Sequence, residues 1–170
     1  MREIANKERT LALLQHLGQQ AKGPGRVYLT GGSSAVIIGW RAETIDVDLK
    51  CDPEPLGIFE GISRAKDELR MNIEFASPDL SGWRDRSQYI DTHGKVDFYH
   101  YDFYSQALAK LERAHQKDLD DVSAMLRENL IKTDRLLDLF ETIKPALIRF
   151  PAIDPTDFEA SVHNFLKNIP

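Results

Sequence analysis

The chain has 170 residues, 42% of them hydrophobic and 29% charged, which is typical of an ordinary globular protein and argues against a disordered chain. The net charge of −5 argues against a protein that holds nucleic acid by broad neutralisation of phosphates, although local basic clusters would still accommodate RNA. Cys51 is the only cysteine, so an internal disulfide is excluded and a reducing, cytoplasmic location is expected.

Helical spacing and turn residues predict the elements of the first half of the chain. The first residues lack the apolar run of a signal peptide, and no segment reaches membrane-spanning length, so no membrane contact is expected. Apolar residues at helical intervals predict a helix over 6–21, which Gly23-Pro24-Gly25 ends. The elements predicted next are a strand at 27–30, a helix at 33–41, a strand at 45–50, a helix at 56–70, a strand at 72–76 and a strand near 95–101.

The second half of the chain is predicted to be helical from residue 104 onward, with breaks near Asn129 and between Pro145 and Pro155. Asp154 before Pro155 predicts a helix start, because aspartate caps a helix and proline suits its first position. This order predicts an α/β (α+β) protein with a mixed sheet flanked by helices. We expect a core at 1–103 and a C-terminal helical extension at 104–170 that packs on the core.

A turn of small residues, Gly31-Gly32-Ser33-Ser34, follows the first predicted strand and leads into an apolar helix. Such a turn presents backbone N–H groups, and the start of a helix favours an anion. Ser33 or Ser34 would cap the helix or donate a hydroxyl to a phosphate. Alone, the pattern equally fits an ordinary strand–turn–helix corner without a ligand.

Two aspartates, Asp46 and Asp48, lie on the next predicted strand. Because side chains alternate along a strand, both point to one face, while the residues between and beside them are expected to point into the core: Ile45, Val47 and Leu49. Neighbouring carboxylates repel each other unless a cation lies between them. Mg²⁺ binds carboxylates together with substrate phosphates. The turn and the pair together predict a metal-dependent site for a nucleoside triphosphate.

A third carboxylate is expected from a later strand, because two-metal transfer needs one to complete a metal site and to help deprotonate the attacking hydroxyl. Glu74 is the first choice, since it lies between two apolar residues on the strand that follows the Asp strand. Asp97 has similar apolar neighbours and is the alternative. Either residue would also fit a solvent-facing acid on an edge strand.

The spacing of Gly31-Gly32-Ser33 and Asp46-Val47-Asp48 resembles the signature of the DNA polymerase β-like nucleotidyltransferase superfamily. The chain looks closest to small bacterial nucleotidyltransferases that include the toxins of abortive-infection-type toxin–antitoxin systems. A second segment, Lys110 to Val122, is similar to the basic-then-acidic helical motif of those toxins. The resemblance covers roughly residues 26–126. It implies a nucleotidyltransferase-like fold with Asp46, Asp48 and Glu74 as the Mg²⁺ ligands.

The resemblance also implies roles for the basic segment. Lys110 would be catalytic, and the nucleotide would bind at Gly31, Gly32, Ser33, Lys110, Arg113 and Asp118. On the helix predicted near residue 110, Lys110, Arg113 and Lys117 recur at three- and four-residue intervals and share one face, which would hold the triphosphate. The alternative is a solvated helix face, on which Asp121 simply holds an arginine in place.

The expected reaction is transfer of a nucleoside monophosphate to a hydroxyl of RNA, such as a tRNA end, or of a protein. The resemblance to toxins also implies an antitoxin as partner. The alternative is a nucleotidyltransferase-fold protein of weakened activity that acts by binding or regulating a partner. The reason is that in many members of the superfamily the strand of the third acid carries another acid, whereas here Asn72 occupies the neighbouring position on the same face. Trp83 would stack a base or cover the edge of a core. The histidines show no metal-ligand spacing.

Overall fold

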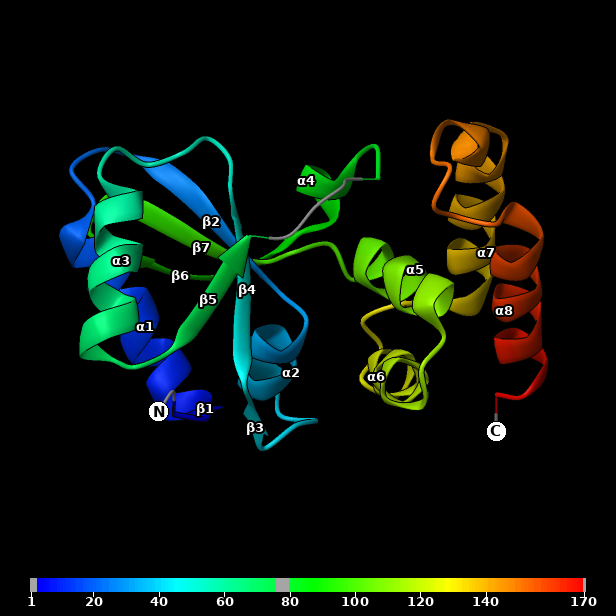
Figure 1. Cartoon of the computed structure of the whole chain (residues 1–170), viewed down its shortest axis with the longest axis horizontal. Helices are drawn as coiled ribbons and strands as arrows, with labels where there is room; N and C mark the ends of the chain where they lie inside the picture. The colour runs from blue at the N-terminus through cyan, green and yellow to red at the C-terminus, as the bar shows by residue number, and fades with distance from the viewer. Residues whose placement is uncertain (1–2, 76–79, 170) are drawn as a thin grey trace. The chain divides into compact units, whose positions relative to one another are not determined.

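The structure is a computed structural model that describes residues 3–75 and 80–169, and for residues 72–75 it describes the backbone alone. The chain divides into two compact units, residues 1–102 and residues 103–170 (Figure 1). The first unit contains the sheet, and the second is helical.

The first unit alternates helices and strands along the chain. Its elements are β1 (Ala5–Asn6), α1 (Lys7–Gln20), β2 (Gly25–Thr30), α2 (Gly32–Ile38), β3 (Glu43–Thr44), β4 (Asp46–Cys51), α3 (Ile58–Glu68), β5 (Asn72–Phe75), α4 (Trp83–Arg86), β6 (Gln88–His93) and β7 (Val96–His100). The predicted strand at 72–76 is therefore found as β5, and residue 76 lies outside the described residues.

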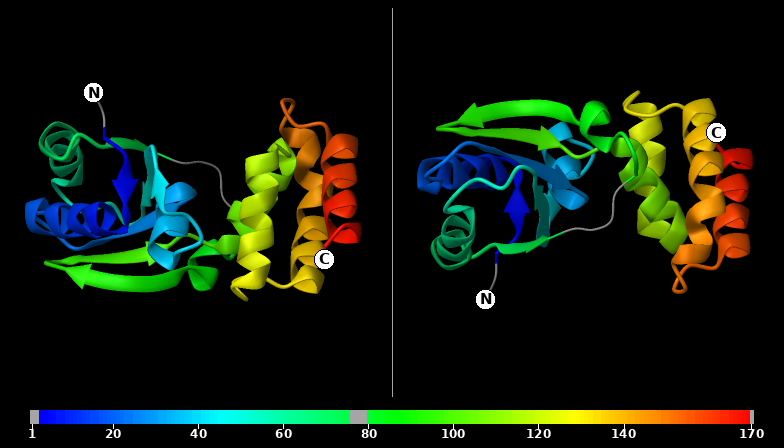
Figure 2. Two further views of the ribbon diagram at one scale, coloured as in Figure 1. Left: turned by 90° about the horizontal axis from the view of Figure 1, so that it is seen from below. Right: turned by 90° about the horizontal axis from the view of Figure 1, so that it is seen from above.

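Five strands form one mixed sheet in the order β5-β4-β2-β7-β6. The central strand β2 pairs antiparallel with β4 and parallel with β7. Of the two edge strands, β5 pairs parallel with β4 and β6 pairs antiparallel with β7. Figure 2 shows the β6–β7 hairpin along one side of the sheet. Because β2 and β4 run in opposite directions, the C-terminal end of β2 and the N-terminal end of β4 lie side by side in the sheet.

The main core lies between the sheet and the helices α1 and α3. It is built from apolar residues of the two helices and from the strand residues that alternate toward them: Leu13, Leu14, Leu17, Val27, Leu29, Val47, Leu49, Ile58, Ile62, Ala65, Val96 and Phe98. A smaller cluster of Tyr28, Trp83 and Tyr101 covers the opposite face. Trp83 is therefore a packing residue, as one of its two predicted roles requires, and its ring lies edge-on to Tyr28 at 4.8 Å.

The helical unit contains α5 (Phe103–Arg113), α6 (Gln116–Arg127), α7 (Thr133–Ile143), the 3-10 helix η1 (Lys144–Arg149) and α8 (Pro155–Lys167). Helix α5 contacts α6, α7 and α8, so it is the centre of this unit. Asp154 caps α8 as predicted, because its carboxylate accepts hydrogen bonds from the N–H groups of Thr156 and Asp157.

The fold class is confirmed: the chain has a mixed sheet flanked by helices and a helical C-terminal part. Packing of that part on the core stays a prediction. None of the helices in the described part of the chain has the length and apolar character needed to cross a membrane.

Candidate functional site

The aspartate pair lies at the start of β4. Val47 and Leu49 are fully buried in the core, while Asp46 and Asp48 are partly buried on the opposite face, as strand alternation requires. The expected burial of Ile45 is wrong, since this side chain is 68% exposed. The reason is that Ile45 precedes β4, which begins only at Asp46, so it does not follow the alternation of that strand.

The Gly31-Gly32 turn lies beside the pair. Gly31 has φ +62° and ψ −131°, a conformation open essentially to glycine alone. A Cβ built on Gly31 would lie only 3.2 Å from Oδ2 of Asp48. The missing side chain thus leaves space directly beside this carboxylate oxygen, which is what a metal ion and a phosphate need.

Hydroxyl groups fix the backbone around the site. Ser33 Oγ donates to the carbonyl of Thr30 at 2.8 Å and lies 3.4 Å from the carbonyl of Asp48. Thr44 Oγ1 donates to the carbonyl of Asp46 at 3.0 Å. The expectation that Ser33 or Ser34 caps the helix is wrong, because the cap of α2 is Gly31 without a side-chain hydrogen bond. A role of Ser33 in nucleotide binding stays a prediction.

A buried histidine supports the turn from β7. Ser34 Oγ donates to the carbonyl of Leu29 at 2.9 Å, and His100 Nδ1 lies 3.0 Å from the same Oγ. Because the serine gives its only proton to Leu29, His100 must donate from Nδ1. His100 is 5% exposed, and burial lowers its pKa to about 4, so the ring is neutral near pH 7.

The two candidates for the third acid lie at different places on the sheet. The register pairs Glu74 with Asp48 and Asn72 with Asp46. Asp97 instead pairs with Arg26 at the far end of β2, whereas Asp48 pairs with Thr30 at the near end. Four residues of strand separate these positions, roughly 13 Å. Backbone pairing therefore favours position 74, although the side chain of Glu74 lies outside the described structure.

The basic-then-acidic segment forms two helices instead of one. Helix α5 ends at Arg113, Ala114 has φ +55°, and α6 begins at Gln116. The expectation that Lys110, Arg113 and Lys117 share one helix face is therefore wrong. The sharp break brings the acids of α6 back against the cations of α5.

This return forms a buried charge cluster within the helical unit. Lys110 Nζ lies 2.7 Å from Asp121 and 3.6 Å from Asp118, and Arg113 binds Asp118 through Nη2 at 2.8 Å. Asp121 thus holds a lysine in place; whether it also holds an arginine, as one alternative expects, stays a prediction. Burial by itself would raise the pKa of Asp118, but the hydrogen bond and charge of Arg113, aided by Lys110, lower it. Catalysis by Lys110 and nucleotide binding by Arg113 and Asp118 stay predictions.

The comparison with protein families decides the relationship. Residues 10–164 match a family described as "Nucleotidyltransferase of unknown function (DUF6036)". The chain is a member of this nucleotidyltransferase family. No curated protein and no solved structure matches the chain.

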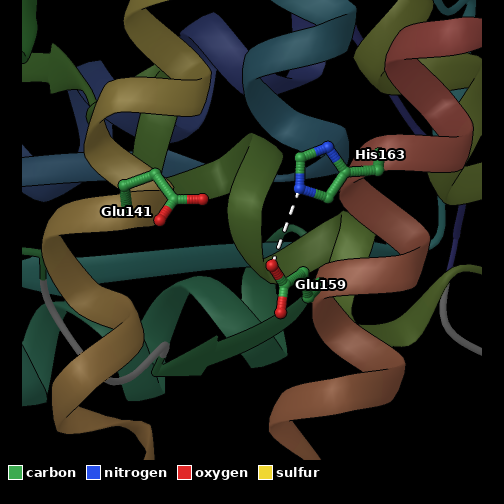
Figure 3. Close-up of side chains that lie close together, drawn as sticks. All are labelled: Glu141, Glu159 and His163. Carbon is green, nitrogen blue, oxygen red and sulfur yellow. Dashed lines mark ion pairs between the residues drawn. The ribbon is translucent and has the colours of Figure 1, made fainter.

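In this DUF6036 member the helical unit contains a second group of acids and a histidine. Glu141 of α7 and Glu159 and His163 of α8 face one another, with ligand atoms within 4.8 Å (Figure 3). The sequence pattern had shown no metal-ligand spacing for His163. Lys144 Nζ binds Glu159 Oε1 at 2.5 Å, and this hydrogen bond raises the pKa of Lys144 and lowers that of Glu159. Lys144 and His163 both pair with Glu159, and the charge of Glu141 also raises the pKa of Lys144.

Sequence reasoning missed three residues that lie beside the glycine turn of the candidate site: Thr44, His100 and Arg41. Thr44 occupies the space where a Cβ on Gly32 would lie, and Arg41 Nη1 is 3.5 Å from that position. Arg41 and Thr44 immediately precede the Asp strand in sequence, which is the signal that would have found them. His100 had no such signal, because it reaches Ser34 only through the parallel pairing of β7 with β2.

Proposed function

We propose that the protein is a Mg²⁺-dependent nucleotidyltransferase that transfers a nucleoside monophosphate from a nucleoside triphosphate to a hydroxyl of RNA or protein. The observation that carries the proposal is the place of Asp48. The side-chain-free Gly31 lies beside its carboxylate, and Glu74 is its partner in the register of β5. Membership in a family described as nucleotidyltransferases supports the reaction class.

The donor set suits Mg²⁺. Carboxylate oxygens are the ligands this ion prefers, and it usually completes its shell with water and substrate phosphates. The space that Gly31 leaves beside Asp48 Oδ2 is open to such a ligand. Asp46, Asp48 and Glu74 would hold the metal, which when bound would polarise the phosphate under attack and offset the charge of the leaving group.

The chemical step joins the acceptor to the nucleotide. The hydroxyl oxygen forms a bond to the α-phosphorus, the bond from that phosphorus to the bridging oxygen of the β-phosphate breaks, and pyrophosphate leaves. The hydroxyl proton passes to a carboxylate, a role that we assign to Glu74 on its register position. The backbone of the Gly31-Gly32 turn would hold the phosphates in line.

The acceptor is assigned from the resemblance to toxin nucleotidyltransferases. It supports an RNA hydroxyl, such as that at a tRNA end, or a protein hydroxyl, and it makes an antitoxin a partner to look for. The net charge of −5 is compatible with an RNA acceptor of which only the end enters the site, because such an acceptor does not require broad neutralisation of its phosphates.

The decisive experiment uses the purified protein, Mg²⁺, each of the four α-³²P-labelled ribonucleoside triphosphates, and total RNA or cell protein as acceptor. Asp48→Asn should abolish labelling. Glu74→Gln should lower kcat strongly with little change in nucleotide affinity, because the lost group acts on the attacking hydroxyl.

Asp97→Asn is the matched control, since it changes an acid of the same sheet at the far end of β2. Its turnover should equal that of the wild type. Normal Mg²⁺-dependent labelling by both Asp46→Asn and Asp48→Asn would disprove the assignment. Damage by Asp97→Asn with a silent Glu74→Gln would move the third acid to β7.

The alternative is a weakened nucleotidyltransferase that binds a partner. One observation favours it: the register places Asn72, an amide, opposite Asp46. This protein would bind a triphosphate with Mg²⁺ but would label no acceptor. Nucleotide binding without labelling in the experiment above would therefore select the alternative.

A further inference from the structure

A guanidinium group lies at the glycine turn of the candidate site. The chain leaves α2 through Gly39, which has φ +117°, and the N–H of Arg41 turns back to the carbonyl of Ala35 at 3.4 Å. The Arg41 side chain then extends toward the start of the same helix. A Cβ built on Gly32 would lie 3.5 Å from its Nη1.

The two glycines are thus flanked by opposite charges. Gly31 lies beside Oδ2 of Asp48, and Gly32 lies beside Nη1 of Arg41. A triphosphate whose reacting phosphate is near Asp48 would extend its remaining phosphates along the turn toward the guanidinium. Thr44 fills the other space beside Gly32, so a side chain at position 32 would displace Thr44 and come into contact with the arginine.

Arg41 and Lys110 lie in different units of the chain and differ in burial. Lys110 is 6% exposed and its ammonium is paired with Asp118 and Asp121 inside the helical unit. Arg41 is partly exposed and belongs to the same unit as the aspartate pair. A guanidinium also suits phosphate better than an ammonium does, because its planar N–H groups bind two oxygens at once.

We propose that Arg41 binds the phosphates that leave as pyrophosphate. The proposal rests on the proposed function and adds to it the residue that recognises the leaving group. It assigns phosphate recognition to the sheet unit itself, with the carboxylates on one side of the glycine turn and Arg41 on the other.

The test is calorimetric titration of the full chain with pyrophosphate in the presence of Mg²⁺, because this probe has no base or sugar. Arg41→Gln should lose roughly ten- to a hundredfold in affinity, the usual cost of a charge-assisted hydrogen bond. Arg41→Lys, which keeps the charge but loses the planar fork, should lose less. Arg64→Gln is the matched control, since Arg64 is an exposed arginine of α3 that binds Gln20, and it should bind like the wild type.

The outcomes separate the two proposals. Wild-type affinity in Arg41→Gln, together with weakened binding in Asp48→Asn, would overturn the role of Arg41 and leave the proposed function standing. If the wild type binds neither pyrophosphate nor any nucleoside triphosphate, both the role of Arg41 and the proposed function are overturned. Should Arg41→Gln not fold, as judged by its thermal transition, Arg41→Lys decides: wild-type affinity in that variant overturns the planar-fork recognition that we propose.

Discussion

Two pairs of aspartates, one in each unit of the molecule, have opposite surroundings. Asp46 and Asp48 lie on one face of β4 and are partly open to solvent. Asp118 and Asp121 lie one turn apart on α6 and are buried among cations. The first pair places two carboxylates on one strand face that solvent reaches, a geometry that suits a ligand. The second pair is neutralised within the fold, a geometry that holds two helices together.

The difference teaches that an acidic pair in the sequence does not by itself mark a metal site. Spacing and exposure decide what such a pair does. On β4 the carboxylates stay accessible because their strand neighbours, Val47 and Leu49, take the buried face. On α6 the helix break at Ala114 lets Lys110 reach both acids.

The largest effect is expected from Lys110→Ala. The change leaves Asp118 and Asp121 buried without their shared cation, which typically costs about 3–5 kcal/mol of unfolding free energy. Urea unfolding followed by circular dichroism measures this loss. Arg113→Ala is the comparison variant and should cost less, because the Arg113 side chain is 50% exposed whereas that of Lys110 is 8% exposed. Equal stability of Lys110→Ala and the wild type would mean that the cluster does not hold α5 to α6.

The second effect, somewhat smaller, is the pH dependence of stability that the buried His100 of the sheet unit should cause. The pKa of His100 is about 4 when folded and near 6.5 when unfolded, so between these values the unfolded chain binds more protons. Stability should therefore fall as the pH falls from 6.5 to 4, by about 3 kcal/mol in all from this group.

His100→Asn isolates that effect. The asparagine amide can donate to Ser34 Oγ as Nδ1 does, but it does not titrate. The unfolding free energies of the wild type and His100→Asn are measured from pH 7 to pH 4. Their dependence on pH should differ only between pH 6.5 and pH 4. Parallel pH profiles would show that His100 is not held neutral by burial.

The smallest effect is expected for Asp46→Asn. Removing one of two like charges should leave the unfolding free energy unchanged or raise it by up to about 0.5 kcal/mol. Thermal unfolding without Mg²⁺ measures this, with Asp118→Asn as the contrasting variant, which should be destabilised. A large loss of stability in Asp46→Asn would show that the strand pair, like the helix pair, is part of the framework of the fold.

The local features of the sheet unit were predictable from the sequence because they depend on neighbours along the chain. The strand, glycine turn, helix and Asp strand between residues 25 and 51 follow from alternation and turn residues. Strand β6 was not predicted, because Gln88–His93 shows no apolar alternation and is a strand only through pairing with β7. Ile45 was misplaced because the start of β4 was set one residue early.

The helix break at Ala114 was equally hidden from the sequence. Alanine favours helix, and neither glycine nor proline marks the position. The left-handed backbone there occurs together with long-range ion pairs that no local pattern shows. For the candidate site, the sequence indicated the carboxylates and the turn, and it held a signal for Arg41 and Thr44 in their positions before the Asp strand, whereas His100 became visible only through the pairing of β7 with β2.

The antiparallel pairing of β2 with β4 has a further consequence for how the site arose and how it can decay. The glycine turn, Arg41, Thr44 and both aspartates are encoded in one short stretch, residues 30–48. Closing so short a segment costs little chain entropy, so its two ends meet at a low cost. Position 74 arrives by a separate crossover through α3. A change at position 74 therefore leaves the chain segment that carries the glycine turn and the aspartate pair untouched, so the third acid of the proposed site can change independently of the other two.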